Sequence, residues 1–265
     1  MPASETSALR APLEAVMREA GTLARKTGQG AFRHWTKGED RSPVSEADIA
    51  VNDLLHQRLS ALAPGAGWVS EETEAAPDTT RALTWVVDPI DGTRAFISGR
   101  ADWSISTALV EDGRPVVAAL YAPVSEEIFL AARGAGATLN GAPIKANEGD
   151  GLRGAKIAGP KRYLERFSNL AGGTLAQPKV HSLALRLARV AQGTLDAAFA
   201  SRGSHDWDLA AADLLVHEAG GALTDFTGRP LKYGSQAVHG ALVAAGQARH
   251  DALIGLVRDR KAEFA

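Results

Sequence analysis

The hydrophobic pattern changes character twice along the chain. Near the N-terminus, apolar residues recur every three or four positions between Leu9 and Ala24, which predicts one long amphipathic helix from Ser4 to about Gly28 or Gly30. A polar stretch follows at positions 37–42, and a second helix is predicted between Ser45 and Pro64, where a helix-breaking residue ends it. The chain therefore opens with two helices.

The middle of the chain predicts a mostly antiparallel sheet. Short apolar or alternating runs are separated by the pairs Asp112-Gly113 and Asn140-Gly141, which favour tight hairpin turns. The predicted strands cover positions 67–70, 83–87, 103–110, 116–121 and 127–132.

After residue 150, predicted strands and helices alternate. The helices are expected at 162–167, 183–191, 209–219 and 251–257, and the strands at 155–158, 194–200 and 240–245. The segment 148–154 is rich in glycine and charge, which is typical of a boundary. We therefore expect an N-terminal α+β half over residues 1–150 and a C-terminal α/β half over residues 151–265.

Composition removes several classes of function. The chain has 265 residues, 29 basic against 31 acidic side chains, and no cysteine. Disulfides, zinc–thiolate sites and thiol nucleophiles are therefore excluded, and the balanced charge argues against a nucleic-acid polymer as partner. No run approaches the roughly 20 apolar residues that cross a bilayer, and the first residues lack the order of a secretory signal. We expect a cytoplasmic protein without a membrane partner.

The sharpest local feature is the segment from Trp85 to Thr93, where an apolar strand delivers Asp88 and Asp91 to a turn. Two carboxylates three residues apart can converge on one hard cation such as Mg²⁺. A helix starting at Thr93 would direct free backbone N–H groups to the same place, beside the cation. Asp-Pro and Asp-Gly pairs are also ordinary turn formers, so an ordinary turn explains this segment equally well on its own.

Each of the other candidate residues has a structural explanation that is favoured when the residue is taken alone. Glu71 and Glu72 follow a short strand and could be a solvated pair. Ser45 and Asp48 have the spacing of a capping box, and Asp208 could be the N-cap of the helix from position 209. Lys37 is expected to be exposed, and three scattered histidines are expected to be surface or core residues: His181, His217 and His239.

In combination, these fragments resemble the inositol monophosphatase superfamily. The matching pieces occur in family order and at family-like spacing along nearly the whole chain. They are Val44-Ser45-Glu46-Ala47-Asp48, Ser70-Glu71-Glu72, Asp88-Pro89-Ile90-Asp91-Gly92-Thr93, and Trp207-Asp208 leading to Glu218-Ala219-Gly220-Gly221. The resemblance implies a layered αβαβα sandwich with a large antiparallel sheet and a smaller mixed sheet, and a homodimer.

The resemblance also implies a set of site residues. Glu71, Asp88 and the carbonyl of Ile90 would hold one Mg²⁺, while Asp88, Asp91 and Asp208 would hold a second, with Glu71 helping a third, weaker ion. Substrate would be bound by Asp91, Gly92, Thr93, Ser182 and Asp208. Asp48, Glu71 and Thr93 would be catalytic and orient a metal-activated water for in-line attack on a small phosphorylated metabolite. No cysteine, serine or histidine stands where it could form a phospho-enzyme.

The identity of the phosphate ester stays open. Inositol-preferring relatives usually carry a glutamate seven residues before the Asp of the Trp-Asp pair, and this chain has Ser201 there. Phe96-Ile97 and Tyr121-Ala122-Pro123-Val124 resemble the 3′(2′),5′-bisphosphate nucleotidase branch, which we favour, whereas other stretches resemble the inositol branch. Inositol-1-monophosphatase, fructose-1,6-bisphosphatase and a non-catalytic metal- or nucleotide-binding regulator are the alternatives. Lys161, Arg162 and Arg202 are candidates to bind a second phosphate.

Overall fold

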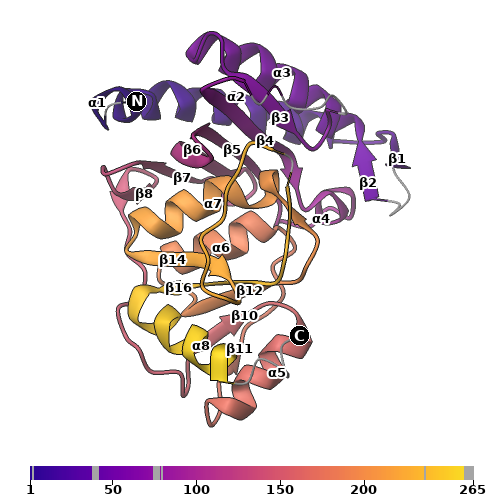
Figure 1. The fold of residues 1–265 in the computed structure, drawn as a ribbon. Coiled ribbons are helices and arrows are strands. Elements are labelled where there is room, and N and C mark those ends of the chain that lie inside the picture. The colour runs from indigo at the N-terminus through magenta and orange to yellow at the C-terminus, as the bar shows by residue number, and fades with distance from the viewer. Residues whose placement is uncertain (2, 38–41, 74–77, 79, 236, 260–265) are drawn as a thin grey trace.

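The computed structural model describes residues 1–259 apart from 2, 38–41, 74–77, 79 and 236, and these residues fold into stacked layers (Figure 1). Helices cover one face of a large sheet, two further helices separate that sheet from a smaller one, and the last helices cover the far side. This arrangement confirms the predicted αβαβα sandwich.

The first helical layer contains α1 (Ala3–Ala8), α2 (Arg10–Thr27) and α3 (Glu46–Leu62). The single predicted N-terminal helix is interrupted at Leu9, because Pro12 has no N–H to donate to the carbonyl four residues earlier. Gly21 lets α2 approach the large sheet closely, since a Cβ there would lie 2.3 Å from the ring of Tyr121.

The large sheet follows chain order, and among the described strands only the first pair, β3 and β4, is parallel. Both predicted turns carry two residues with positive φ, at Asp112-Gly113 and Asn140-Gly141, as a tight hairpin requires. The strands are β3 (Gly67–Ser70), β4 (Leu83–Asp91), β5 (Ser104–Glu111), β6 (Arg114–Ala122), β7 (Glu127–Ala132), β8 (Ala137–Leu139) and β9 (Ala142–Pro143).

Helices α6 (Leu183–Ala191) and α7 (Asp206–Glu218) pack between the two sheets. The smaller, mixed sheet has the order β11-β10-β12-β16-β14, and α5 (Lys161–Leu170) and α8 (Gln247–Asp259) cover its other face (Figure 1). Its strands are β10 (Lys156–Ala158), β11 (Leu175–Ala176), β12 (Ala197–Ala200), β14 (Gly221–Asp225) and β16 (Leu242–Gly246).

Several elements differ from the prediction. A hairpin of β1 (His34–Lys37) and β2 (Ser42–Ser45) precedes α3, and the two-residue strands β13 (Ser204–His205) and β15 (Val238–His239) pair with each other. None of these strands was predicted, nor was β14. Helix α7 begins at Asp206 rather than at 209, so Asp208 lies in its first turn and is not the N-cap.

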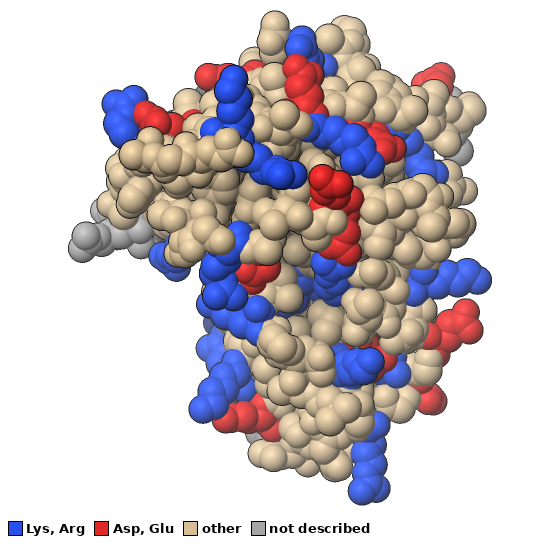
Figure 2. Space-filling model, turned by 180° about the vertical axis from the view of Figure 1, so that it is seen from behind, with Lys and Arg blue, Asp and Glu red and all other residues tan. Residues whose placement is uncertain are grey.

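The predicted division at residue 150 falls between the two sheets, in a stretch without a helix or strand at 144–155. One hydrophobic cluster nevertheless includes residues from both sheets and from α6 and α7, and the division stays a prediction. Among the described residues, no helix is long and apolar enough to cross a membrane. Basic and acidic side chains are interspersed over the face shown in Figure 2.

Candidate metal centre

The end of β4 brings two carboxylates to the base of a cleft. Asp88 pairs with Ser106 of β5 and Asp91 pairs with Ser104, so β4 has one more residue than its partner and bulges there. Gly92 then takes a φ of 95°, and α4 (Thr93–Ile97) begins. A Cβ on residue 92 would also meet the Ser182 backbone nitrogen at 3.2 Å, so the turn needs glycine for its conformation and for space.

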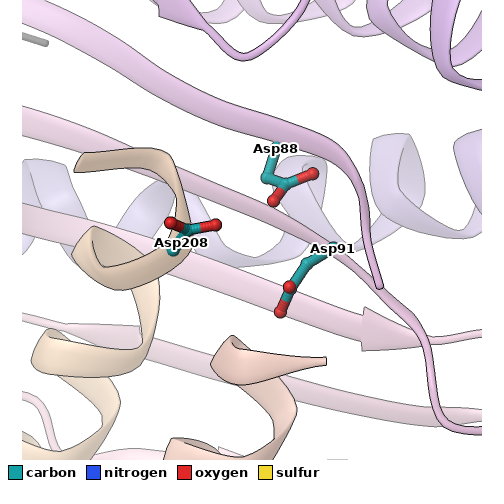
Figure 3. Close-up of side chains that lie close together, drawn as sticks. All are labelled: Asp88, Asp91 and Asp208. Atoms are coloured by element: carbon teal, nitrogen blue, oxygen red, sulfur yellow. The ribbon is translucent and has the colours of Figure 1, made fainter. Parts of the chain in front are cut away.

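Asp208 joins this pair from the first turn of α7 (Figure 3). One carboxylate oxygen from each of Asp88, Asp91 and Asp208 lies within 4.8 Å of the others. Burial raises the pKa of Asp88 well above its ordinary value, and the neighbouring charges of Glu71 and Asp91 raise it further. Burial likewise raises the pKa of Asp208, with Asp91 adding to the effect. Two buried acids and one partly buried acid at this spacing repel one another as anions unless a cation lies between them.

Asp91 is also anchored to the start of α6. Its Oδ2 accepts hydrogen bonds from the Ser182 hydroxyl and the Ala184 N–H, both at 2.6 Å, and its Oδ1 accepts one from the Leu183 N–H at 3.1 Å. Burial raises the pKa of Asp91, and these hydrogen bonds partly offset the increase. Ser182 is fully buried beside Asp91. Its contact with the cleft is the hydrogen bond that its hydroxyl donates to the Asp91 carboxylate.

Asp48 reaches the cleft through Thr93. The predicted capping box is present, because Asp48 Oδ2 accepts from the Ser45 N–H at 2.8 Å and from its hydroxyl at 2.6 Å. The Thr93 hydroxyl lies 3.2 Å from Asp48 Oδ1 and 3.0 Å from the Ile90 carbonyl oxygen. Burial raises the pKa of Asp48 to about 6, against the lowering effect of the bonds from Ser45.

Most of the predicted site residues line one cleft of about 410 Å³, which we call the metal cleft. Burial raises the pKa of Glu71 to about 7. The predicted residues that line the metal cleft are Glu71, Asp88, Ile90, Asp91, Gly92, Thr93 and Asp208.

Lys37 is not the exposed residue that we expected. Its Nζ donates to Glu72 Oε1 at 2.5 Å and to the Glu71 carbonyl at 3.0 Å, and lies 3.5 Å from Glu71 Oε1. Glu72 is correspondingly almost buried, with 4% of its side chain exposed, rather than solvated. The β1–β2 hairpin thus holds the loop that carries Glu71.

Three basic residues in the metal cleft were missed: Arg94, Lys179 and His181. Arg94 follows the Asp-Gly-Thr turn directly, which was an available signal. Lys179 and His181 precede α6, whose first residues donate hydrogen bonds to Asp91 and so bring this segment to the cleft. No local sequence pattern marks these two residues.

The three candidates for a second phosphate site do not line the metal cleft. Lys161 is exposed on α5 and faces Glu165 at 3.5 Å, and Arg162 lies over the Tyr163 ring at 4.6 Å. Arg202 lines a different cavity, of about 770 Å³, which among the described residues shares only Gly203 with the metal cleft.

The donors present fit magnesium. The metal cleft offers carboxylate oxygens and the Ile90 carbonyl, and among the described residues the three-carboxylate group contains neither nitrogen nor sulfur ligands. Hard divalent cations prefer such oxygen donors.

Comparison with known proteins agrees with this geometry. A family model described as "Inositol monophosphatase family" matches residues 5–262. The chain is 32% identical to an inositol-1-monophosphatase of Rhizobium meliloti, over 88% of this chain and 91% of that protein. It is 34% identical to the Nus factor SuhB of Escherichia coli K12, over 80% of this chain and 82% of SuhB.

Solved structures agree as well. The fold resembles the extragenic suppressor protein suhB of Bartonella henselae, with a TM-score of 0.81 and 28% identity over 94% of this chain and 97% of that one. A structure described as an IMPase/NADP phosphatase complexed with Mg²⁺ and phosphate has a TM-score of 0.81 at 20% identity, over 92% and 93% of the two chains. At that identity the likeness concerns the fold alone.

Proposed function

Because the chain belongs to the inositol monophosphatase family and is therefore a phosphatase, we propose that it hydrolyses a bisphosphorylated nucleotide, 3′-phosphoadenosine 5′-phosphate, to AMP. The observation that carries the phosphatase chemistry is the convergence of Asp88, Asp91 and Asp208 within 4.8 Å beside the buried Asp48–Thr93 contact. The proposal also includes a homodimer and a cytoplasmic location.

The family is magnesium-dependent, and we assign the ligands as the resemblance implies. Glu71, Asp88 and the Ile90 carbonyl would hold one ion, and Asp88, Asp91 and Asp208 a second, while Glu71 would help a third, weaker ion. The bound ions would neutralise charge on the phosphate and make a nearby water more acidic.

The side chains around the ligands would orient the substrate and the water. The proton of the Thr93 hydroxyl can point either toward the Ile90 carbonyl oxygen or toward Asp48 Oδ1. With the Ile90 carbonyl serving as a metal ligand, the Thr93 hydroxyl would donate to Asp48 Oδ1 and keep a lone pair that could accept a hydrogen bond from water. Glu71 would accept a second hydrogen bond from the same water. Positioning of this kind is the main protein contribution to phosphoryl transfer.

Ser201 supports the nucleotide over the inositol substrate. Its hydroxyl cannot supply the carboxylate that inositol-preferring relatives usually carry there, so one means of binding two ring hydroxyls is missing. Inositol-1-monophosphatase activity is the second candidate, because the Rhizobium meliloti relative bears that name.

A substrate panel tests the proposal. Phosphate release with Mg²⁺ is measured on 3′-phosphoadenosine 5′-phosphate, inositol 1-phosphate and fructose 1,6-bisphosphate. We expect kcat/KM to be roughly tenfold or more higher for the nucleotide, which corresponds to about 1.4 kcal/mol of transition-state binding. A preference for inositol 1-phosphate would reject the nucleotidase assignment and leave the phosphatase chemistry intact.

Failure to release phosphate from all three would favour the non-catalytic regulator. The Asp88→Asn variant, which lacks a central ligand, is the control for contaminating phosphatases and should release none.

A further inference from the structure

Two of the three basic residues that line the metal cleft come from one short segment. Lys179 and His181 lie in the short segment before α6 and line the same cleft as Gly92 and Thr93. Lys179 forms no ion pair with the described residues, although four carboxylates line the cleft: Glu71, Asp88, Asp91 and Asp208. A cation left unpaired in an acidic cleft is available to an anion that arrives with the substrate.

His181 is fixed in one orientation. Its Nδ1 lies 2.6 Å from Asp102 Oδ2, and its backbone N–H donates to the same oxygen at 2.8 Å. Because Nδ1 donates to a carboxylate, Nε2 is the nitrogen left for a ligand. A phosphate oxygen of the substrate can therefore form a hydrogen bond with Nε2.

Asp102 anchors this segment through its contacts with His181 and Ser182. Burial raises its pKa, but hydrogen bonds from His181 and Arg100 keep the value below the ordinary one, so Asp102 is an anion. Its backbone carbonyl accepts from the Ser182 N–H at 3.0 Å, and Ser182 in turn donates to Asp91. The position of His181 is therefore tied, through two residues, to an expected metal ligand.

Lys179 also lies between two hollows. Besides the metal cleft, it lines an adjoining hollow of about 490 Å³ together with Arg100 and Arg189. Small-molecule sites have volumes of about 300–1,000 Å³, so the two hollows together leave room for a ligand that extends beyond the carboxylates of the expected metal site.

We propose that Lys179 and His181 form a second anion site, the cationic rim, which binds a phosphate group of the substrate other than the one that is hydrolysed. The inference rests on the proposed function and extends it, because the expected metal ions and the Gly92–Thr93 turn serve the scissile phosphate only. The cationic rim selects substrates with two phosphates over those with one.

The test compares two nucleotides that share the scissile ester. 3′-Phosphoadenosine 5′-phosphate carries the second phosphate, and adenosine 3′-phosphate lacks it. In Lys179→Met and in His181→Asn, we expect the ratio of the bisphosphate KM to the monophosphate KM to rise roughly ten- to a hundredfold, as for loss of one charge-assisted hydrogen bond. The side-chain amide of asparagine can still donate to Asp102, but it has no counterpart of the histidine Nε2.

A binding measurement supplies a readout that does not depend on turnover. AMP carries the second phosphate and no scissile ester, and calorimetry should show weaker AMP binding to both variants by a similar factor. Lys161→Met is the matched control, because Lys161 is an exposed lysine that lines neither hollow and faces Glu165. It should bind AMP as the wild-type protein does.

The outcomes separate the cationic rim from the nucleotidase assignment. An equal KM increase for both nucleotides would overturn the cationic rim and leave the nucleotidase standing. A wild-type protein that hydrolyses inositol 1-phosphate and neither bisphosphate would overturn both. Preference for fructose 1,6-bisphosphate, with its KM raised in both variants, would reject the nucleotidase and support the cationic rim.

Discussion

Three of the expected site carboxylates also stabilise the start of a helix. Asp48 accepts from the Ser45 N–H ahead of α3, Asp208 accepts from the His205 N–H at 2.6 Å ahead of α7, and Asp91 accepts from the first N–H groups of α6. At the scale of the single residue, capping and chemistry are therefore not alternatives. Local arguments that favoured a cap were right about Asp48 and missed that its second oxygen faces Thr93.

A partly buried acid outside the metal cleft makes stability depend on pH. Burial raises the pKa of Asp213 to about 6, despite a hydrogen bond from Tyr233 at 2.8 Å. An unfolded aspartate titrates near pH 3.9, so the folded state holds a proton that the unfolded state has lost between these values. This contribution to stability is complete below about pH 4 and is lost as the pH rises through 6.

Asp213→Asn removes that titration and keeps an oxygen for Tyr233. Between pH 5 and pH 8, we expect the wild-type protein to lose roughly 1 kcal/mol more unfolding free energy than the variant. Urea unfolding of both proteins at the two pH values measures the difference. Parallel changes in the two proteins would show that Asp213 does not titrate in this range.

At the scale of the element, α3 connects stability to the site through one hydroxyl. Ser45→Ala removes the 2.6 Å bond to Asp48 Oδ2. Loss of an N-cap side chain costs about 1 kcal/mol, and a loosened Asp48 should lower kcat while KM changes little. Thermal unfolding and steady-state kinetics measure the two effects. Ser45→Thr keeps the hydroxyl, so its stability and its kcat should both be close to those of the wild-type protein. Unchanged kinetics in Ser45→Ala would show that this cap does not contribute to catalysis.

The elements themselves were predictable where a strong periodicity or a turn pair marks them. Helix α6 has the predicted bounds, and both hairpin turns lie at their Asp-Gly and Asn-Gly pairs. The misses have physical causes: β1 is largely exposed, so no apolar run marks it, and β13 and β15 have two residues each.

The sequence points to the four carboxylates that line the metal cleft, but it does not point to Lys179 and His181. Glu71, Asp88, Asp91 and Asp208 occur in motifs that resemble the family, whereas Lys179 and His181 acquire their place from contacts between distant segments. The bond that fixes His181 joins residues 79 positions apart, and no local pattern encodes it.

At the scale of the whole molecule, the metal cleft is lined by residues from both predicted halves. β4 supplies Asp88 and Asp91. α7 supplies Asp208, which lies 117 residues after Asp91 in the chain (208 − 91). We expect weak, mutually dependent metal sites, because the ligands are shared. A ligand that binds only the folded protein raises its stability by mass action.

Chelation should therefore abolish activity and lower the melting temperature. At Mg²⁺ concentrations about 100-fold above the dissociation constant, the midpoint should rise by roughly 5–10 °C over the chelated protein. Calorimetric scans with EDTA and with Mg²⁺ measure the shift. Asp88→Asn should lose most of it, and a full shift in that variant would contradict a central role for Asp88.

The double use of these carboxylates also affects how the chain's ancestry can be interpreted. A descendant that abandoned hydrolysis would still be selected to keep Asp48, Asp91 and Asp208, because three helices start on them. Asp88 is under weaker structural constraint, since its described hydrogen bond is to the Ile90 N–H two residues away. Among relatives with divergent roles, retention of Asp88 is the better record of continued selection for chemistry.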